Sequence, residues 1–311
     1  MCCLFGLIDY GNVFTAREKN RIIKVLSAEC EVRGTDATGI AFNSENRLCI
    51  YKRPLAAHKL WYRIPENSKV IMGHTRMTTQ GSEKYNFNNH PFQGHAGGHD
   101  FALAHNGVLH NDRELRITEH LPKTKIQTDS YVAVQLLEHY GEISIENVGK
   151  MAETVSGSFC FSILTDTKEL YLVKGNNPLV IYDCGGYYIY ASTADILNNT
   201  LKKLHIDKKN DIDIRFGEIF KISADGTIER GSFSNEVDDY PYYPYWGIYD
   251  AFSGYDTELD TLIRSAGYFG FEESDIIMLT DLGYDALEIE EMLYDPFSMR
   301  EIISEYREIM V

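Results

Sequence analysis

The 311 residues carry 44% hydrophobic and 24% charged side chains, which is ordinary for a globular protein and excludes a fibrous repeat or a chain disordered throughout. The formal net charge of -16 is unevenly distributed. Residues 1–234 carry 27 basic and 27 acidic side chains, whereas residues 235–311 carry 3 and 19, with 10 of the 21 tyrosines. An acidic chain without a basic stripe repels phosphate backbones, so we expect no nucleic-acid partner.

Neither a membrane segment nor a disulfide framework is evident. The longest apolar runs, such as residues 158–164, are too short to span a bilayer, and the N-terminus lacks the basic region of a secretory signal. We therefore expect a cytoplasmic protein with no membrane partner. The six cysteines have no spacing typical of a metal knuckle or of disulfide pairs, so most of them are expected to be reduced thiols.

The predicted elements begin with a short apolar run at residues 4–8. Thr15 and Glu18 then form a capping box, which predicts a helix ending at Gly34. Further strands are expected at residues 38–43, 47–52, 70–75, 101–105, 158–164, 169–174, 187–191 and 217–222. Helices are expected at residues 112–120 and 128–140. This mixture predicts an α+β fold in which antiparallel sheets pack together and are covered by helices.

The acidic end of the chain has a different pattern. Residues 235–256 are rich in tyrosine, proline and acid and indicate a connector between residues 1–234 and 257–311. The last segment is predicted to be a small acidic helical module, with helices near residues 259–263, 276–283, 289–293 and 299–310. Part of it resembles the three-helix ubiquitin-associated fold; an acidic cap on the edge of the body's own sheet is the alternative. Its tyrosine content also favours a role in docking a partner.

Cys2 directly follows Met1, and its side chain is small enough that removal of the initiator methionine is expected. A cysteine with a free α-amine carries nucleophile and base in one residue, because an amine with a reference pKa of about 7.7 can take the thiol proton. On its own, however, Cys2 is more simply interpreted as a buried thiol. Whether Cys2 is a nucleophile or a buried thiol has to be judged from the other residues of the sequence.

Polar residues interrupt apolar runs at several expected helix and strand ends: Arg33, Asp36, Arg76, Asn106, Gly107 and Asp129. Each has a structural explanation when taken alone. Asn106-Gly107 is a common turn sequence, and Asp129 suits the first turn of a helix.

Taken together with Cys2, in this order and spacing, these motifs resemble the class II (N-terminal nucleophile) glutamine amidotransferases over about residues 2–222. The matching motifs are Cys2 with Phe5-Gly6, residues 33–40, Gly73 to Arg76, Asn89-His90-Pro91, His105-Asn106-Gly107 and Thr128-Asp129-Ser130, with weaker matches at residues 157–159, 178–179 and 190–192. The resemblance implies a four-layer αββα N-terminal nucleophile hydrolase sandwich.

The resemblance also implies the catalytic roles. Cys2 would attack the side-chain amide of free L-glutamine, with Asn106 and Gly107 donating hydrogen bonds to the oxyanion. Arg76 would bind the α-carboxylate of glutamine in a two-pronged pair, and Asp129 would bind its α-ammonium. No cofactor is implied.

Further matched positions are expected to support this site. Thr79 and His90 match positions that line or support the glutamine pocket, whereas Arg33 and Asp36 match positions that brace the nucleophile loop. Two features depart from the family or add to it. Met77 stands where many members have an aromatic residue, and Cys3 is a second thiol that we interpret as a packing residue.

The expected products are glutamate and ammonia, formed through a γ-glutamyl thioester. No motif of an ammonia-accepting domain follows residue 235, so either a separate synthase or another protein partner receives the ammonia, or the protein is a stand-alone hydrolase. We favour the first, because free hydrolysis wastes nitrogen.

Three alternatives remain open. The protein is an N-terminal nucleophile amidase acting on another amide, a non-catalytic regulator on the same fold, or a metal protein. The metal alternative rests on His90, His95, His99, His105 and His110. Because no histidine pair is spaced i, i+4 on a helix with a carboxylate, we expect no metal.

Overall fold

The computed structural model describes residues 2–45, 47–208, 210–234, 263, 266, 271–284, 288–289, 292–293 and 296–309. The chain divides into two compact units, Met1–Val237 and Asp238–Val311. The units are described separately below. The expected connector, residues 235–256, lies outside the described residues.

The elements of the first unit alternate between strands and helices. Its strands are β1 (Cys3–Ile8), β2 (Ala37–Ser44), β3 (Arg47–Arg53), β4 (Val70–Arg76), β5 (Phe92–Ala96), β6 (His99–Leu109), β7 (Gly157–Thr165), β8 (Leu170–Lys174), β9 (Val180–Asp183), β10 (Tyr188–Ala191), β11 (Asn210–Ile212), β12 (Glu218–Ile222) and β13 (Ile228–Ser232). Its α-helices are α1 (Ala16–Glu29), α2 (Asp112–Thr118), α3 (Tyr131–Tyr140), α4 (Ile145–Thr154) and α5 (Ala194–Leu204), and single 3-10 turns lie at Cys30–Arg33, Ala57–Lys59 and Asn86–Asn88.

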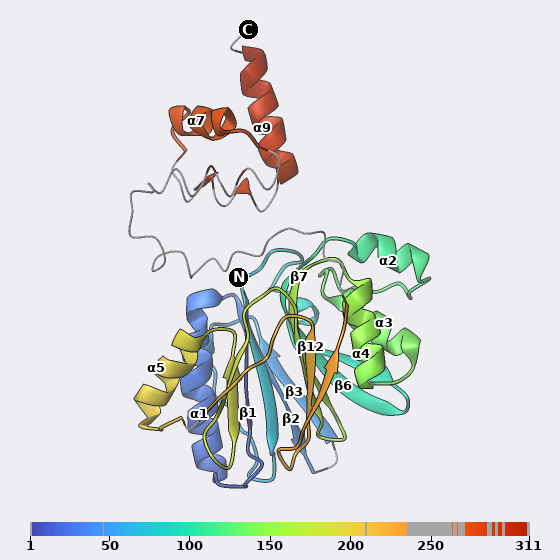
Figure 1. The fold of residues 1–311 in the computed structure, drawn as a ribbon, viewed down its shortest axis with the longest axis vertical. Coiled ribbons are helices and arrows are strands. Elements are labelled where there is room, and N and C mark those ends of the chain that lie inside the picture. Colours follow the sequence, from blue (N-terminus) through green and yellow to red (C-terminus); the bar gives the residue numbers. More distant parts are fainter. Residues whose placement is uncertain are drawn as a thin grey trace. The chain divides into compact units, whose positions relative to one another are not determined.

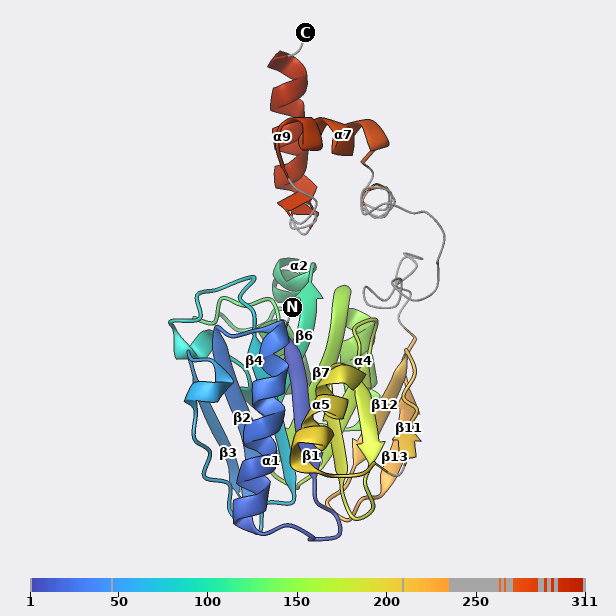
Figure 2. The same cartoon turned by 90° about the vertical axis from the view of Figure 1, so that its left-hand side faces the viewer.

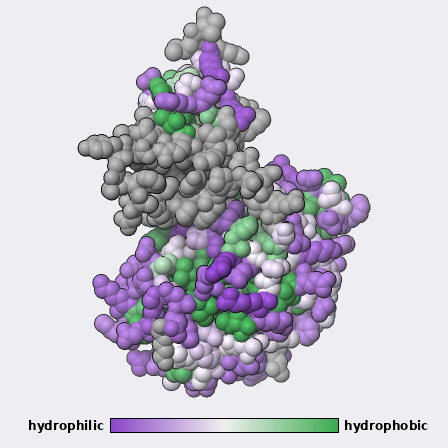
Figure 3. Space-filling view, viewed as in Figure 1, coloured by the Kyte–Doolittle hydropathy of each residue, from purple (hydrophilic) through white to green (hydrophobic). Residues whose placement is uncertain are grey.

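Two antiparallel sheets stack face to face in this unit (Figures 1 and 2). One has the strand order β11-β9-β10-β1-β4-β2-β3 and the other β13-β12-β8-β7-β6-β5. Helices α1 and α5 cover the outer face of the first sheet, and α3 and α4 cover that of the second. In Figure 3 apolar residues gather toward the middle of this unit with hydrophilic residues among them, and hydrophilic residues predominate along both sides. The result is the αββα sandwich that the resemblance implies.

Strand β1 shows how one segment contributes to two apolar cores. Phe5 and Leu7 pack toward α1 and α5, whereas Leu4 and Ile8 pack between the two sheets. Successive side chains of a strand point to opposite faces, so a strand buried on both faces needs apolar side chains throughout. This is why the run at residues 4–8 contains no polar side chain.

Helix α1 begins with the expected capping box. Thr15 Oγ1 accepts from Glu18 N (3.4 Å), and Glu18 Oε2 accepts from Thr15 N (2.9 Å), which satisfies two backbone donors that a helix start leaves free. The α-helix itself ends at Glu29, and a 3-10 turn carries the chain on to Gly34.

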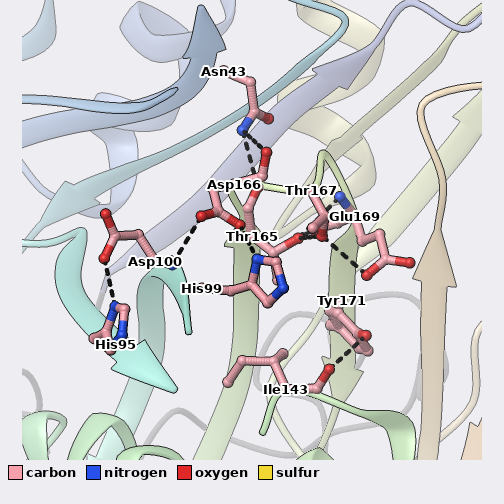
Figure 4. A network of polar contacts seen from close by, with 10 residues as sticks. All are labelled: Asn43, His95, His99, Asp100, Ile143, Thr165, Asp166, Thr167, Glu169 and Tyr171. Atoms are coloured by element: carbon pink, nitrogen blue, oxygen red, sulfur yellow. Dashed lines mark hydrogen bonds and ion pairs between the residues drawn. The ribbon is translucent and has the colours of Figure 1, made fainter. Parts of the chain in front are cut away.

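A polar network ties the two sheets together at one end of the sandwich (Figure 4). Asn43 Nδ2 on β2 donates to Thr165 O on β7 (2.9 Å), and Asp166 accepts from Asp100 N (3.1 Å) and pairs with His99 Nδ1 (3.0 Å). Thr165 pairs with the first half of β6, whereas Asn106 lies in its second half. The network therefore lies far along the ladder from the predicted oxyanion donors.

The second unit is helical where it is described. Helices α7 (Glu273–Asp281) and α9 (Pro296–Ile309) correspond to the expected helices at residues 276–283 and 299–310. They share a small apolar cluster of Ala266, Phe271, Ile276, Leu279, Ile289, Leu293, Met299 and Ile303. Residues 259–262 of the expected first helix lie outside the described residues, and the third helix is described only in part. Among the helices that the structure describes, none is long and apolar enough to cross a membrane.

Candidate active site

Strands of both sheets bring the predicted site residues together. The β1–β4 ladder pairs Cys3 with Thr75, which puts Cys2 beside Arg76. Leu4 N on β1 and Asn106 Nδ2 on β6 both donate to Ser192 Oγ, at 2.9 and 3.4 Å. One buried hydroxyl therefore couples the strand of the nucleophile to the expected oxyanion donor.

The Cys2 thiol is partly exposed, with its Sγ 3.5 Å from Met77 O. Burial raises the pKa of the Cys2 thiol, against the lowering effects of the Met77 contact and the Arg76 charge, and Asp129 raises it further. A thiol with a raised pKa stays protonated at neutral pH, so its attack on an amide requires a base. The β1–β4 register independently puts Arg76 beside this thiol.

The two predicted supporting residues contact backbone around the nucleophile. Arg33 Nε donates to Cys2 O (2.8 Å). Asp36 Oδ2 accepts from Thr78 N (2.7 Å), and Asp36 N donates to Arg76 O (3.0 Å). Arg33 thus holds the residue before β1, and Asp36 holds the turn after β4.

The guanidinium of Arg76 is buried and already held by the chain. Nη1 donates to Asn89 Oδ1 (2.7 Å), and Nη2 donates to Gln80 O (2.6 Å) and Gly81 O (2.7 Å). In the described part of the chain, Nε and the second Nη1 hydrogen have no acceptor. A ligand carboxylate would take these donors or replace one of the carbonyls.

Asp129 is fixed next to the end of β6. Its Oδ2 accepts from Leu109 N (2.7 Å) and its Oδ1 from Ser130 Oγ (3.3 Å). Ser130 Oγ lies 2.8 Å from His105 Nδ1. The carboxylate is therefore anchored just beyond Asn106-Gly107 while its charge still reaches the Cys2 thiol.

The Asn106-Gly107 pair occupies a backbone position that requires glycine. Gly107 has φ of 148°, and a Cβ atom at this position would lie 1.9 Å from Ser158 O. Both the dihedral angle and the lack of space exclude a side chain. Asn106 is held by its main chain as well, because its O accepts from Asn177 Nδ2 (2.9 Å).

His90 and Thr79 have different surroundings. His90 is buried between the rings of His74 and Phe92, with centroids 4.2 and 4.4 Å away, and neither ring nitrogen has a partner among the described residues. Burial, together with the charges of His74 and Arg76, holds the pKa of His90 well below its usual range, so the ring is neutral. Thr79 is exposed and makes no hydrogen bond to any described residue.

The five histidines of the metal hypothesis do not gather at one place. His95 pairs with Asp100 and His99 with Asp166, both on exposed surface, whereas His90 and His105 are buried. Within the described residues, no group of three His, Cys, Asp or Glu side chains is arranged to hold a metal ion.

Comparison with known proteins points to one family. A family model described as a glutamine amidotransferase domain matches residues 74–199. A glutamine–fructose-6-phosphate aminotransferase of Staphylococcus aureus is 30% identical over 250 residues, a match that covers 76% of this chain and 40% of that protein. The chain belongs to the class II glutamine amidotransferase family.

A further curated relative and a solved structure are also similar to this chain. The Staphylococcus epidermidis protein of the same name is 29% identical over 257 residues, with the same coverage of 76% and 40%. A glutamine phosphoribosylpyrophosphate amidotransferase from B. subtilis superposes with a TM-score of 0.61 at 21% identity, covering 75% of this chain and 49% of that one, which shows the shared fold. The chain spans about 40% of the length of the curated relatives it matches.

Two residues at the amidotransferase site had little signal in the sequence. Ser192 falls in one of the weaker family matches, but nothing local indicates that its hydroxyl joins two sheets. Lys52 is half-buried, and its Nζ donates to Asn89 O (2.5 Å) and Pro91 O (2.9 Å). A lysine near the end of an edge strand ordinarily points to solvent, so its sequence context predicts no such contact.

Proposed function

We propose that this protein hydrolyses the side-chain amide of free L-glutamine with Cys2 as the nucleophile. Sγ bonds to the amide carbon, and the oxyanion receives hydrogen bonds from Asn106 Nδ2 and Gly107 N–H. The carbon–nitrogen bond then breaks, ammonia leaves with the proton taken from the thiol, and water cleaves the γ-glutamyl thioester to glutamate and a free thiol. The observation that carries this proposal is the sheet register that puts Cys2 beside Arg76, together with the Ser192 hydroxyl that ties the strand of the nucleophile to Asn106.

The base in this reaction is the α-amine of Cys2 after Met1 has been removed. In the unprocessed chain this nitrogen belongs to a peptide bond and cannot accept a proton. Since burial raises the pKa of the thiol, the thiolate does not form unaided at neutral pH. An amine with a reference pKa of about 7.7, carried by the same residue, suits the proton transfer.

Charge complementarity selects the substrate. A cationic Arg76 and an anionic Asp129 near one thiol match the α-carboxylate and α-ammonium of a free amino acid. A glutamine within a peptide lacks both charges, and a bulky apolar amide offers neither. This pairing favours glutamine over the other amides that N-terminal nucleophile hydrolases cleave.

The test is glutamate release by the purified protein once mass spectrometry shows that Met1 is absent. The wild type should release glutamate from glutamine, and Cys2→Ala should release none. Cys3→Ala is the matched control, because its nitrogen stays in a peptide bond in the processed chain, and it should keep most of the activity. A wild type that cleaves another amide but not glutamine would replace this proposal by the amidase alternative, and an inert wild type would support a regulator.

We further propose that the ammonia passes to a separate acceptor protein. The relatives named above are a glutamine–fructose-6-phosphate aminotransferase and a phosphoribosylpyrophosphate amidotransferase, and this chain spans only part of each. The acidic segment 235–311 is the proposed docking element, since it carries the excess negative charge and much of the tyrosine. Pull-downs with the full chain and with residues 1–234 would test it; equal recovery of partners would contradict the docking role.

A further inference from the structure

Lys52 lies on β3, the edge strand of the first sheet, opposite Gly39 on β2. A Cβ atom on Gly39 would lie 2.1 Å from His90 O and 2.9 Å from Pro91 Cδ, so the glycine lets the segment 89–91 lie directly on β2. Lys52 Nζ donates to Asn89 O and Pro91 O, at 2.5 and 2.9 Å. The ammonium therefore clamps this segment from both sides of His90.

Asn89 contacts both Lys52 and Arg76 and so connects the two cations. Its side chain is fully buried, with Oδ1 accepting from Arg76 Nη1 (2.7 Å) and Nδ2 donating to Glu83 O (2.8 Å). Reversing the amide would place a donor against the guanidinium and leave buried groups unpaired, which is costly. Lys52 thus holds the main chain of Asn89, and Glu83 O holds its side chain. Together these contacts fix the position of Nη1 of the Arg76 guanidinium.

The two cations are also coupled by charge. Burial, together with the charge of Arg76, lowers the pKa of Lys52 to about 8, so Lys52 remains mostly protonated at neutral pH. Among the described residues, neither Lys52 nor Arg76 has a carboxylate within ion-pair distance. A buried Arg76 and a half-buried Lys52, neither with a carboxylate within ion-pair distance among the described residues, favour binding of an anion, because its charge offsets part of their desolvation cost.

We propose that Lys52 and Asn89 are positioning residues that hold Arg76 for a substrate α-carboxylate, and that they set the selectivity of the site for a free amino acid. This inference rests on the proposed function. Lys52 acts through Asn89 and through its charge, whereas Arg76 touches the substrate. Loss of Lys52 should therefore weaken binding of the carboxylate and leave the chemistry at Cys2 nearly unchanged.

The experiment compares L-glutamine with its α-amide, which lacks the α-carboxylate, in steady-state glutaminase assays of the full chain. Lys52→Met should raise KM for glutamine about tenfold with kcat nearly unchanged, the scale of one lost hydrogen bond to a charged group. Lys52→Arg should restore most of the affinity. On the α-amide, Lys52→Met and wild type should have equal kcat/KM.

Lys24→Met is the matched control. Lys24 is also a partly buried lysine whose Nζ donates to loop carbonyls, those of Ala57, His58 and Leu60, but it contacts no residue of the site. It should change neither substrate's kinetics. If circular dichroism shows Lys52→Met to be unfolded, Asn89→Ala carries the test with the same expected rise in KM.

Each outcome bears on the proposal. An unchanged KM for glutamine, or an equal loss on both substrates, would overturn the positioning role while leaving the proposed function intact. A wild type that neither hydrolyses nor binds glutamine would overturn the proposed function and this inference together.

Discussion

Gly107 combines a catalytic and a structural demand at one residue. Its backbone N–H is a proposed oxyanion donor, and its φ of 148° and the nearby Ser158 O exclude a side chain. The donor can be placed here only because the residue has no Cβ atom. Local geometry and the proposed chemistry therefore require the same amino acid.

We predict that Gly107→Ala lowers kcat/KM for glutamine by about a hundredfold or more, because relief of the clash with Ser158 O displaces an oxyanion donor. Glutamate release is the measurement. Gly98→Ala is the control, since Gly98 also has a positive φ (83°) but a Cβ atom there meets nothing within 4 Å. Comparable kinetic losses in both variants would show that backbone strain alone explains the effect.

At the scale of single elements, helix α1 supports the sheet that carries the nucleophile. Its apolar residues Ile22, Ile23 and Leu26 pack in the same cluster as Phe5 and Leu7 of β1. The capping box at Thr15 fixes where this helix begins. A change at the start of α1 should therefore lower the free energy of unfolding without changing the chemistry at Cys2.

We predict that Thr15→Ala lowers the free energy of unfolding by about 1 kcal/mol, because it removes a side-chain acceptor from the helix start. Chemical denaturation measures this loss, and glutamine kinetics should stay at the wild-type level. Thr193, at the start of α5, makes no capping hydrogen bond with its side chain. A loss of the same size in Thr193→Ala would argue against the capping explanation.

Two strands that the sequence did not predict have a weak local pattern. Strands β11 and β13 lie at sheet edges and are largely exposed, so they lack the apolar alternation that marks a strand. Helix α5 was also not predicted, although its buried Ile196, Leu197, Thr200 and Leu201 follow a helical spacing. Strands buried on both faces, such as β1 and β7, were predicted because their burial requires continuous apolar sequence.

At the scale of the whole molecule, three buried histidines near the active site make the free energy of unfolding depend on pH. Burial lowers the pKa of His74 to about 3 and also lowers those of His90 and His105. Between about pH 6.5 and the lowered values, the unfolded chain binds protons that the folded chain does not. Stability contributed by the neutral rings is therefore present above about pH 6.5 and is lost as the pH falls.

We predict that His74→Gln reduces the pH dependence of the unfolding free energy by about 1.4 kcal/mol per pH unit between about pH 6 and 4. Urea titrations at several pH values measure this slope. His139→Gln is the control, because this side chain is exposed on α3. An unaltered slope in His74→Gln would mean that the ring is already protonated in the folded protein.

The linear sequence alone indicated most of the strands that are buried on both faces, the start of α1 and the family. It also indicated which residues form the candidate site: Cys2, Arg76, Asn106, Gly107 and Asp129. These depend on local apolar pattern and on motif spacing, which a linear sequence contains. The confirmed αββα sandwich followed from the family resemblance, and the site roles remain proposals.

How those residues are held depends on the three-dimensional arrangement of the chain. Ser192 joins the two sheets, Asn89 and two loop carbonyls contact Arg76, Lys52 donates to main-chain carbonyls of residues 89–91, and Thr79 is exposed. Each contact joins residues whose approach depends on sheet register, loop path and packing around the site. No local pattern in the sequence specifies that approach, because a hydrogen bond depends on where two groups lie in space.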